Sequence, residues 1–128
     1  MSIVLDSSAV LASLLDEPGK EPVDAAINGA MLTTVNLAEV VGYFAKLGAD
    51  EVEISAMLKS LPYVLVDVDQ ELAVAAGMMR PLGETVGLSL ADRICLAHAR
   101  RLDGKAMTAD RAWKKVAEKI GVDVHLIR

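Results

Sequence analysis

The segment that decides the fold spans residues 88–110 and reads LSLADRICLAHARRLDGKAMTAD. Ser89 is a suitable N-cap for a helix that extends to about Arg101. After a short turn that contains a glycine, residues 105–108 predict a buried strand, and Asp110 follows two residues later. A helix that leads directly into a strand is typical of α/β proteins, so the same alternation is expected elsewhere in the chain.

The alternation extends to both ends of the chain. Strands are predicted at Ile3–Leu5, Met31–Thr34, Tyr63–Val66, Lys105–Thr108 and Val122–Ile127. Helices are predicted at 9–15 (capped by Ser7 or Ser8), 23–27, 36–46, 50–61, 69–79, 89–101 and 110–119, with a loop at 83–87. We therefore expect one α/β domain over residues 1–128, a three-layer α/β/α arrangement with a central parallel sheet of four to five strands.

Composition excludes several classes of protein. Hydrophobic residues make up 53% of the chain and aromatic residues only 3%, which excludes a disordered protein and predicts an aliphatic core. No apolar run approaches the roughly 20 residues that a membrane-spanning helix needs. The first six residues lack the basic start of a signal peptide, and the single cysteine, Cys95, fits a reducing cytoplasm. We expect a cytoplasmic protein whose surplus apolar surface lies in an interface with another chain.

Charge is unevenly distributed along the chain. Residues 1–92 contain 4 basic and 14 acidic side chains, a balance of −10, whereas residues 93–128 contain 9 basic and 4 acidic ones, a balance of +5. Together they give the net charge of −5. An acidic protein is not expected to coat nucleic acid indiscriminately, but the basic C-terminal third could hold a phosphate backbone. Solvated helix faces are the alternative explanation.

Four acidic residues are expected at one edge of the sheet. Asp6 directly follows the first strand, and Asp110 lies two residues past the fourth. Glu39 and Asp92 fall in the first turns of two helices. In open parallel sheets the ligand site lies outside the carboxyl ends of the strands, where all four side chains can converge.

Each acid also has an ordinary explanation. Residues 36–39 and 89–92 both resemble capping boxes, in which the acid satisfies the start of its own helix, and Asp110 is suited to be an N-cap. Capping does not explain why the four acids share an edge. It also does not explain Asp6, which follows an apolar strand and should be poorly solvated.

Clustered carboxylates suggest a bound cation. Carboxylates packed closely together repel each other, and their pKa values rise unless a cation neutralises them. Mg²⁺ prefers oxygen ligands and keeps several waters, so such a site could act on a phosphoryl group. His98 and His125 do not complete a ligand pattern with the acids and are expected to be structural or exposed, and Cys95 is expected to face the core.

Four motifs, which occur in the same order along the whole chain, resemble those of one family. They are Val4–Ala9, Asn36–Val40, Leu88–Arg93 and Thr108–Arg111. In these motifs and in length the chain is similar to the PIN-domain ribonucleases, specifically the VapC-type toxins of toxin–antitoxin pairs. The resemblance implies a PIN domain over residues 1–128 that acts as a Mg²⁺-dependent endoribonuclease, with Mn²⁺ as a substitute. It also implies that metal-activated water hydrolyses the phosphodiester bonds of RNA.

The resemblance also assigns roles to individual residues. It implies that Asp6 and Asp92 are the principal metal ligands, and that Glu39 and Asp110 complete the catalytic site directly or through water. Whether one ion or two bind stays open.

Four further residues would support this site. The hydroxyls of Ser8 and Thr108 match positions that support the acids, although both are also suited to capping or turn roles. Arg93 and Arg111 each follow one of the acids and could hold the scissile phosphate, with local ion pairs as the alternative.

The family also implies partners. These are a cognate antitoxin, an RNA substrate such as a tRNA or rRNA, and a second copy of the chain in a homodimer. Residues 40–47 and 54–61 carry the apolar side chains that we expect in these interfaces, with a core role as the alternative.

Three other functions are compatible with a fold of this class. A phospho-receiver module would fit the length and fold, but such a module needs a lysine after its last core strand, whereas Lys105 precedes a strand. A phosphatase of the haloacid dehalogenase type needs a second acid at position 8, where this chain has Ser8. A catalytically silent protein-binding module of the same fold is the other alternative.

Overall fold

The computed structural model describes residues 2–128 and contains a five-stranded sheet in which every neighbouring pair of strands is parallel. The strand order is β3-β2-β1-β4-β5. The strands are β1 (Ile3–Leu5), β2 (Met31–Thr33), β3 (Val64–Val66), β4 (Lys105–Thr108) and β5 (Asp123–Leu126). The predicted α/β architecture is therefore confirmed, with strand ends shifted by only one residue.

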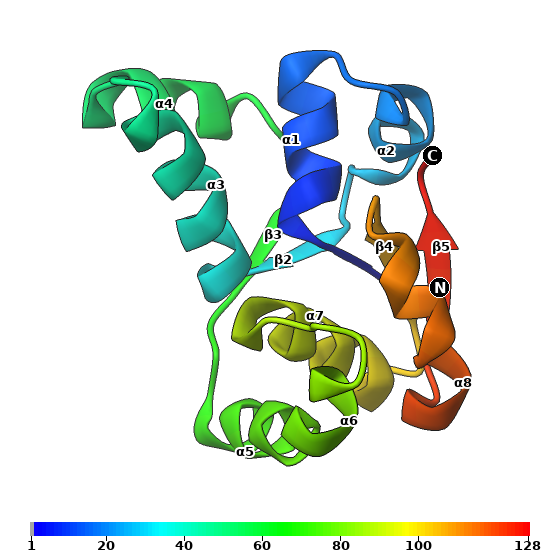
Figure 1. The fold of residues 1–128 in the computed structure, drawn as a ribbon. Helices are drawn as coiled ribbons and strands as arrows, with labels where there is room; N and C mark the ends of the chain where they lie inside the picture. The colour runs from blue at the N-terminus through cyan, green and yellow to red at the C-terminus, as the bar shows by residue number, and fades with distance from the viewer. Residues whose placement is uncertain (1) are drawn as a thin grey trace.

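Both faces of the sheet are covered by helices, which makes three layers (Figure 1). Successive side chains of a strand point to opposite faces, so Val4 and Leu5, both fully buried, belong to two different hydrophobic clusters. Leu5 packs with side chains from α1 to α4, whereas Val4 packs with side chains from α5, α7 and the segment before β5. This double coverage explains the high apolar fraction of the chain.

The helices follow the predicted pattern, with changes at their ends. They are α1 (Ser7–Leu15), α2 (Lys20–Ala26), α3 (Thr34–Lys46), α4 (Glu51–Lys59), α5 (Gln70–Met78), α6 (Arg80–Glu84), α7 (Leu90–Arg101), the 3-10 helix η1 (Arg111–Lys115) and α8 (Ala117–Ile120). No helix within residues 2–128 has the length and apolar character needed to cross a bilayer.

The starts of α1 and α3 differ from the prediction. Ser7 and Ser8 lie inside α1, and the N-cap position is occupied by Asp6, whose side chain makes no capping hydrogen bond. Helix α3 begins two residues earlier than predicted, because the hydroxyl of Thr33 accepts a hydrogen bond from the Asn36 backbone N–H. Asn36 is therefore the third residue of α3 rather than its cap.

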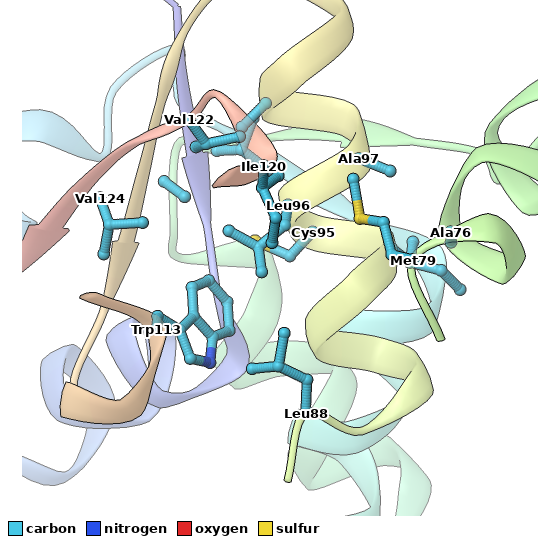
Figure 2. Packing of buried hydrophobic residues seen from close by; sticks show 14 of the residues in the cluster. Ala76, Met79, Leu88, Cys95, Leu96, Ala97, Trp113, Ile120, Val122 and Val124 are labelled. Carbon is cyan, nitrogen blue, oxygen red and sulfur yellow. The ribbon is translucent and has the colours of Figure 1, made fainter. Parts of the chain in front are cut away.

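Two predicted segments were wrong in type. The expected loop at 83–87 is partly the short helix α6, which has Pro81 in its first turn, a position that proline tolerates. The expected helix at 110–119 is divided into η1 and α8. In a 3-10 helix side chains three residues apart eclipse, so Trp113 and Val116 both turn into the core. Figure 2 shows Trp113 in the same cluster as Leu96 and Val124.

Candidate active site

The site lies at the carboxyl edge of the sheet, where the strand order changes direction. From β1 the chain goes outward to β2 and β3 on one side, and β4 and β5 lie on the other. The switch point is therefore between β1 and β4, whose ends carry Asp6 and Asp110. The two strand ends are joined by a hydrogen bond of 2.9 Å from the Asp6 backbone N–H to the carbonyl of Met107.

Asp6 is the buried centre of this site, with only 4% of the residue exposed. Its Oδ2 atom accepts hydrogen bonds from the hydroxyls of Ser8 at 2.7 Å and Thr108 at 2.8 Å. Burial raises the pKa of Asp6, the two hydroxyls partly offset this effect, and the nearby charge of Glu39 adds to the rise. Ser8 and Thr108 therefore both contact the carboxylate of Asp6.

Glu39 is exposed on α3 and reaches towards the start of α1. Its Oε1 atom accepts a hydrogen bond of 2.8 Å from the hydroxyl of Ser7 and a longer one of 3.5 Å from the amide of Asn36. Asn36 is fully buried, and its amide also donates to the carbonyl of Ala91 at 3.4 Å, on α7. The expected capping box between Asn36 and Glu39 is therefore replaced by a bridge that ties α3 to α7.

Asp92 lies in the first turn of α7 and is half-buried. Its Oδ2 atom accepts a hydrogen bond of 2.8 Å from the backbone N–H of Ser89, and the Ser89 hydroxyl accepts from the Asp92 N–H, so the predicted capping box is present. Burial raises the pKa of Asp92, the Ser89 N–H offsets part of the rise, and the charges of Asp6 and Asp110 increase it. Asp92 can therefore complete the capping box of α7 and also belong to the candidate site.

Asp110 is exposed and caps η1. Its Oδ1 atom accepts a hydrogen bond of 2.9 Å from the backbone N–H of Ala112. Its own N–H donates to the hydroxyl of Thr108 at 3.0 Å, and the same hydroxyl donates to Asp6. Thr108 therefore connects the two acids at the ends of β1 and β4.

The four acids form one electrostatic group. Glu39 acts on the pKa of Asp6, and both Asp6 and Asp110 act on the pKa of Asp92, so every acid is coupled to at least one other. As their side chains are placed here, no three His, Cys, Asp or Glu groups within residues 2–128 form a cluster that could hold a metal ion. The protein's own N–H and O–H donors hold each carboxylate instead.

The donor set nevertheless fits a hard cation. All four side chains offer only oxygen, and Asp6 and Asp92 both resist ionisation in their present surroundings. Mg²⁺ keeps several waters and is usually bound through one or two carboxylates, so a pre-formed cluster of three ligands is not required.

Ser7 and Asn36 are site residues that sequence reasoning missed. The sequence pattern indicates only a helix cap for Ser7 and only the start of a capping box for Asn36. The available signal was position: both lie within one helical turn of a candidate acid. Ser7 contacts Glu39, 32 residues away along the chain, and Asn36 contacts Ala91, 55 residues away. Local sequence patterns do not reveal contacts at such separations.

The two arginines differ in their surroundings. Arg93 points towards α5, where its Nη1 atom donates to the carbonyl of Ala76 at 3.0 Å, and its Cδ atom lies near Gly83. These contacts give Arg93 a structural role. They do not support the expected contact between Arg93 and a phosphate. Arg111 is exposed directly after Asp110.

Cys95 and His98 are buried, whereas His125 is exposed. Cys95 is fully buried among the core residues, and burial raises the pKa of its thiol well above the usual value. His98 is buried at the other end of α7, where its ring lies between the Arg101 guanidinium and the sulfur of Met31. His125 is exposed on β5.

Comparisons with known proteins identify the family and the fold. A family model described as PIN domain matches residues 3–119. The structure is similar to that of a VapBC complex from Salmonella typhimurium bound to DNA (TM-score 0.76, 16% identity, covering 100% of this chain and 99% of that chain). It is also similar to VapBC2 from Rickettsia felis bound to a promoter fragment (0.73, 16%, 98% and 98%). VapBC-5 from Mycobacterium tuberculosis is a third similar structure (0.64, 22%, 98% and 99%). No curated protein sequence matches the chain.

Proposed function

The chain belongs to the PIN domain family, and on this premise we propose that it is a divalent-metal-dependent endoribonuclease, the toxin of a toxin–antitoxin pair. The observation that carries the proposal is the convergence of Asp6, Glu39, Asp92 and Asp110 at the switch point of the sheet. They come from four separate parts of the chain, and the pKa values of Asp6 and Asp92 respond to their charges. The carboxyl ends of the strands are where the fold places ligands.

In this proposal Asp6 and Asp92 hold Mg²⁺, or Mn²⁺ as a substitute, and Glu39 and Asp110 complete the site directly or through water. When bound, the ion would supply a more acidic water and polarise the phosphoryl oxygens of the substrate. A cation would also relieve the like-charge repulsion that now raises the pKa of Asp92.

The chain's other residues position these acids. Ser8 and Thr108 hold one oxygen of Asp6, so its carboxylate has a fixed orientation. Ser7 holds Glu39, and Asn36 keeps the start of α3 against the start of α7. Glu39 and Asp110 are exposed, so the site opens towards solvent on the side where a large substrate such as tRNA or rRNA can approach.

We also propose a cognate antitoxin and a second copy of the chain as partners. Support comes from apolar side chains that the core does not use: Tyr43 is 41% exposed, Leu47 67% and Val52 78%, all on α3, α4 and their connection. Other residues of the predicted interface, among them Val40, Phe44 and Ile54, are core residues instead. The similar structures named above are toxin–antitoxin complexes, and such a pair would act in the cytoplasm, where its RNA is found.

No contact favours the phospho-receiver alternative. Lys105 begins β4 and its ammonium lies 4.0 Å from the carboxylate of Asp123, at the opposite end of the strand from the acids.

Metal-dependent cleavage of total tRNA tests the proposed function. Wild-type protein, purified free of any antitoxin, should cut RNA with Mg²⁺ or Mn²⁺ and lose this activity in EDTA. Asp6→Asn should reduce the rate by on the order of 100-fold or more, because it removes a buried charge from the site. Asp50→Asn is the matched control, since Asp50 caps α4 outside the site. Equal rates for all three proteins, or cleavage that persists in EDTA, would contradict the proposal.

A further inference from the structure

The basic side chains of the protein divide into two groups. Within residues 2–128, five of them pair with an acid: Lys20, Arg80, Arg101, Lys105 and Arg128. Arg93 is held by a backbone carbonyl. Among those with no ion-pair partner in the described residues, Arg111, Lys114, Lys115 and Lys119 all lie between β4 and β5. The free positive charge is therefore concentrated in one short segment, directly after Asp110.

The shape of η1 places these charges on the outside. Trp113 is fully buried, whereas Arg111, Lys114 and Lys115 are exposed. The backbone bonds from Trp113 N–H to Asp110 and from Val116 N–H to Trp113 show the three-residue repeat of a 3-10 helix. Residues three apart eclipse in such a helix, so Arg111 and Lys114 lie on the same side, about 6 Å apart along the axis. We call Arg111, Lys114 and Lys115 the η1 ridge.

The η1 ridge is fixed relative to the acids by a continuous series of hydrogen bonds. Asp6 accepts from the Thr108 hydroxyl at 2.8 Å, and that hydroxyl accepts from the Asp110 N–H at 3.0 Å. Asp110 in turn accepts from the Ala112 N–H, inside η1, at 2.9 Å. Because Trp113 anchors the middle of η1 in the core, the ridge cannot move far from the site.

Helix stability does not explain the start of the ridge. Arg111 is the first residue of η1, where the partial positive charge of a helix N-terminus disfavours a cation. Lys114 and Lys115 lie in the last turn of η1 and Lys119 lies in the last turn of α8, where a cation is favourable, so only Arg111 lacks this explanation. We leave Lys119 out of the ridge because it belongs to α8 and not to η1.

A polyanionic substrate needs positive charge at this place. The net charge of the chain is −5, and four carboxylates surround the site, so the site itself repels a phosphate backbone. Arginine and lysine at the rim offset this repulsion, and the guanidinium of Arg111 matches the geometry of a phosphate. Resting on the function proposed above, we propose that the η1 ridge binds the phosphate backbone of the RNA substrate beside the acids.

Binding of RNA without cleavage tests this inference. Fluorescein-labelled tRNA in EDTA would be titrated with wild type and with the triple variant Arg111→Gln/Lys114→Gln/Lys115→Gln, and anisotropy measured at several KCl concentrations. We expect the variant to bind at least roughly 10-fold more weakly at about 0.1 M salt. The slope of log K against log salt should fall by about 2–3, as expected for three lost phosphate contacts.

The chain offers a matched control, Lys46→Gln/Lys59→Gln/Arg100→Gln. It removes two lysines and one arginine that are also exposed and unpaired in the described residues, but that lie in the last turns of α3, α4 and α7. We expect it to retain most of the affinity. An equal loss in both triple variants would show an effect of net charge alone and would overturn the assignment.

Two further outcomes separate this inference from the proposed function. If wild type does not cleave RNA but the ridge variant still loses RNA binding, the ridge stands and the nuclease proposal fails. If wild type cleaves RNA and the ridge variant binds as tightly as the control, the ridge fails alone. A loss confined to single-stranded DNA of matching sequence would overturn the assignment to RNA.

Discussion

Asp6 differs from Asp92 and Asp110 in what its position does for the fold. Asp92 completes the capping box of α7, and Asp110 is the N-cap of η1, a role worth about 1 kcal/mol, so both have a structural reason to be there. Asp6 occupies the N-cap position of α1 without capping it, and it is nearly fully buried. Its hydrogen bonds come from Ser8 and Thr108, which belong to the site, so helix capping does not explain why a carboxylate is buried at this position.

Repulsion within the site predicts a pH-dependent effect of Asp92→Asn. Burial and neighbouring acids raise the pKa of Asp92 in the folded protein above its unfolded value. The folded state therefore binds more protons, and metal-free wild type loses stability as the pH rises from the unfolded pKa through the folded one. Asp92→Asn keeps an oxygen to accept from the Ser89 N–H but has no charge. Its melting temperature should match that of wild type near pH 3 and exceed it by a few degrees at pH 7.

Asp50→Asn is the control variant for this experiment, because Asp50 also belongs to a capping box but is the N-cap of α4, outside the site. Thermal unfolding in EDTA, followed by circular dichroism across this pH range, should show no comparable gain for Asp50→Asn. A lower melting temperature of Asp92→Asn at pH 7 would mean that the capping role outweighs repulsion in the site.

At the level of helices and strands, the sequence predicts most of what positions the site. Strands appear where apolar runs end in polar residues, and the helices predicted over 50–61, 69–79 and 89–101 have Asp50, Asp69 and Ser89 as their N-caps. One of the failures has a tertiary cause. Trp113 must be buried, and this divides the predicted helix at 110–119.

For the site, the positions of the acids can be predicted from the sequence, but their hydrogen-bond partners cannot. The places of the four acids follow from the ends of the strands and the starts of the helices. The hydrogen-bond donors of these acids do not follow from such local features, since Glu39 accepts from Ser7 on another helix. The direction of Arg93, which donates to the carbonyl of Ala76, does not follow from them either. Such contacts join residues that are distant in sequence, and no local pattern encodes them.

The turn between α7 and β4 gives a prediction about packing. A Cβ atom added at Gly104 would lie 2.5 Å from the carbonyl oxygen of Ser2, which accepts the hydrogen bond from Lys105 N–H. The backbone would have to move, so Gly104→Ala should lower the free energy of unfolding by about 1–3 kcal/mol. Gly77→Ala, inside α5 with open space around it, should instead raise it by about 0.5–1 kcal/mol.

Urea unfolding monitored by Trp113 fluorescence measures both changes. Equal destabilisation by the two substitutions would show that the approach of Gly104 to Ser2 does not constrain the junction of β1 and β4.

Considered as a whole, the molecule combines opposite charges at one place. The sheet order brings acids from both halves of the chain to the switch point between β1 and β4. The acidic N-terminal part supplies Asp6, Glu39 and Asp92, while the basic C-terminal part supplies Asp110 and the η1 ridge. A group of acids beside exposed basic side chains suits the binding of a cation and of a polyanion at neighbouring positions.

The central claim is that these acids together bind a divalent cation, and the most direct test is the effect of Mg²⁺ on the melting temperature at pH 7. A ligand that binds only the folded state raises its stability in proportion to the logarithm of the concentration above Kd. Wild type and Asp50→Asn should therefore melt at progressively higher temperatures as Mg²⁺ is added, and Asp92→Asn should respond little. Equal shifts in all three proteins, or none in wild type, would contradict the claim.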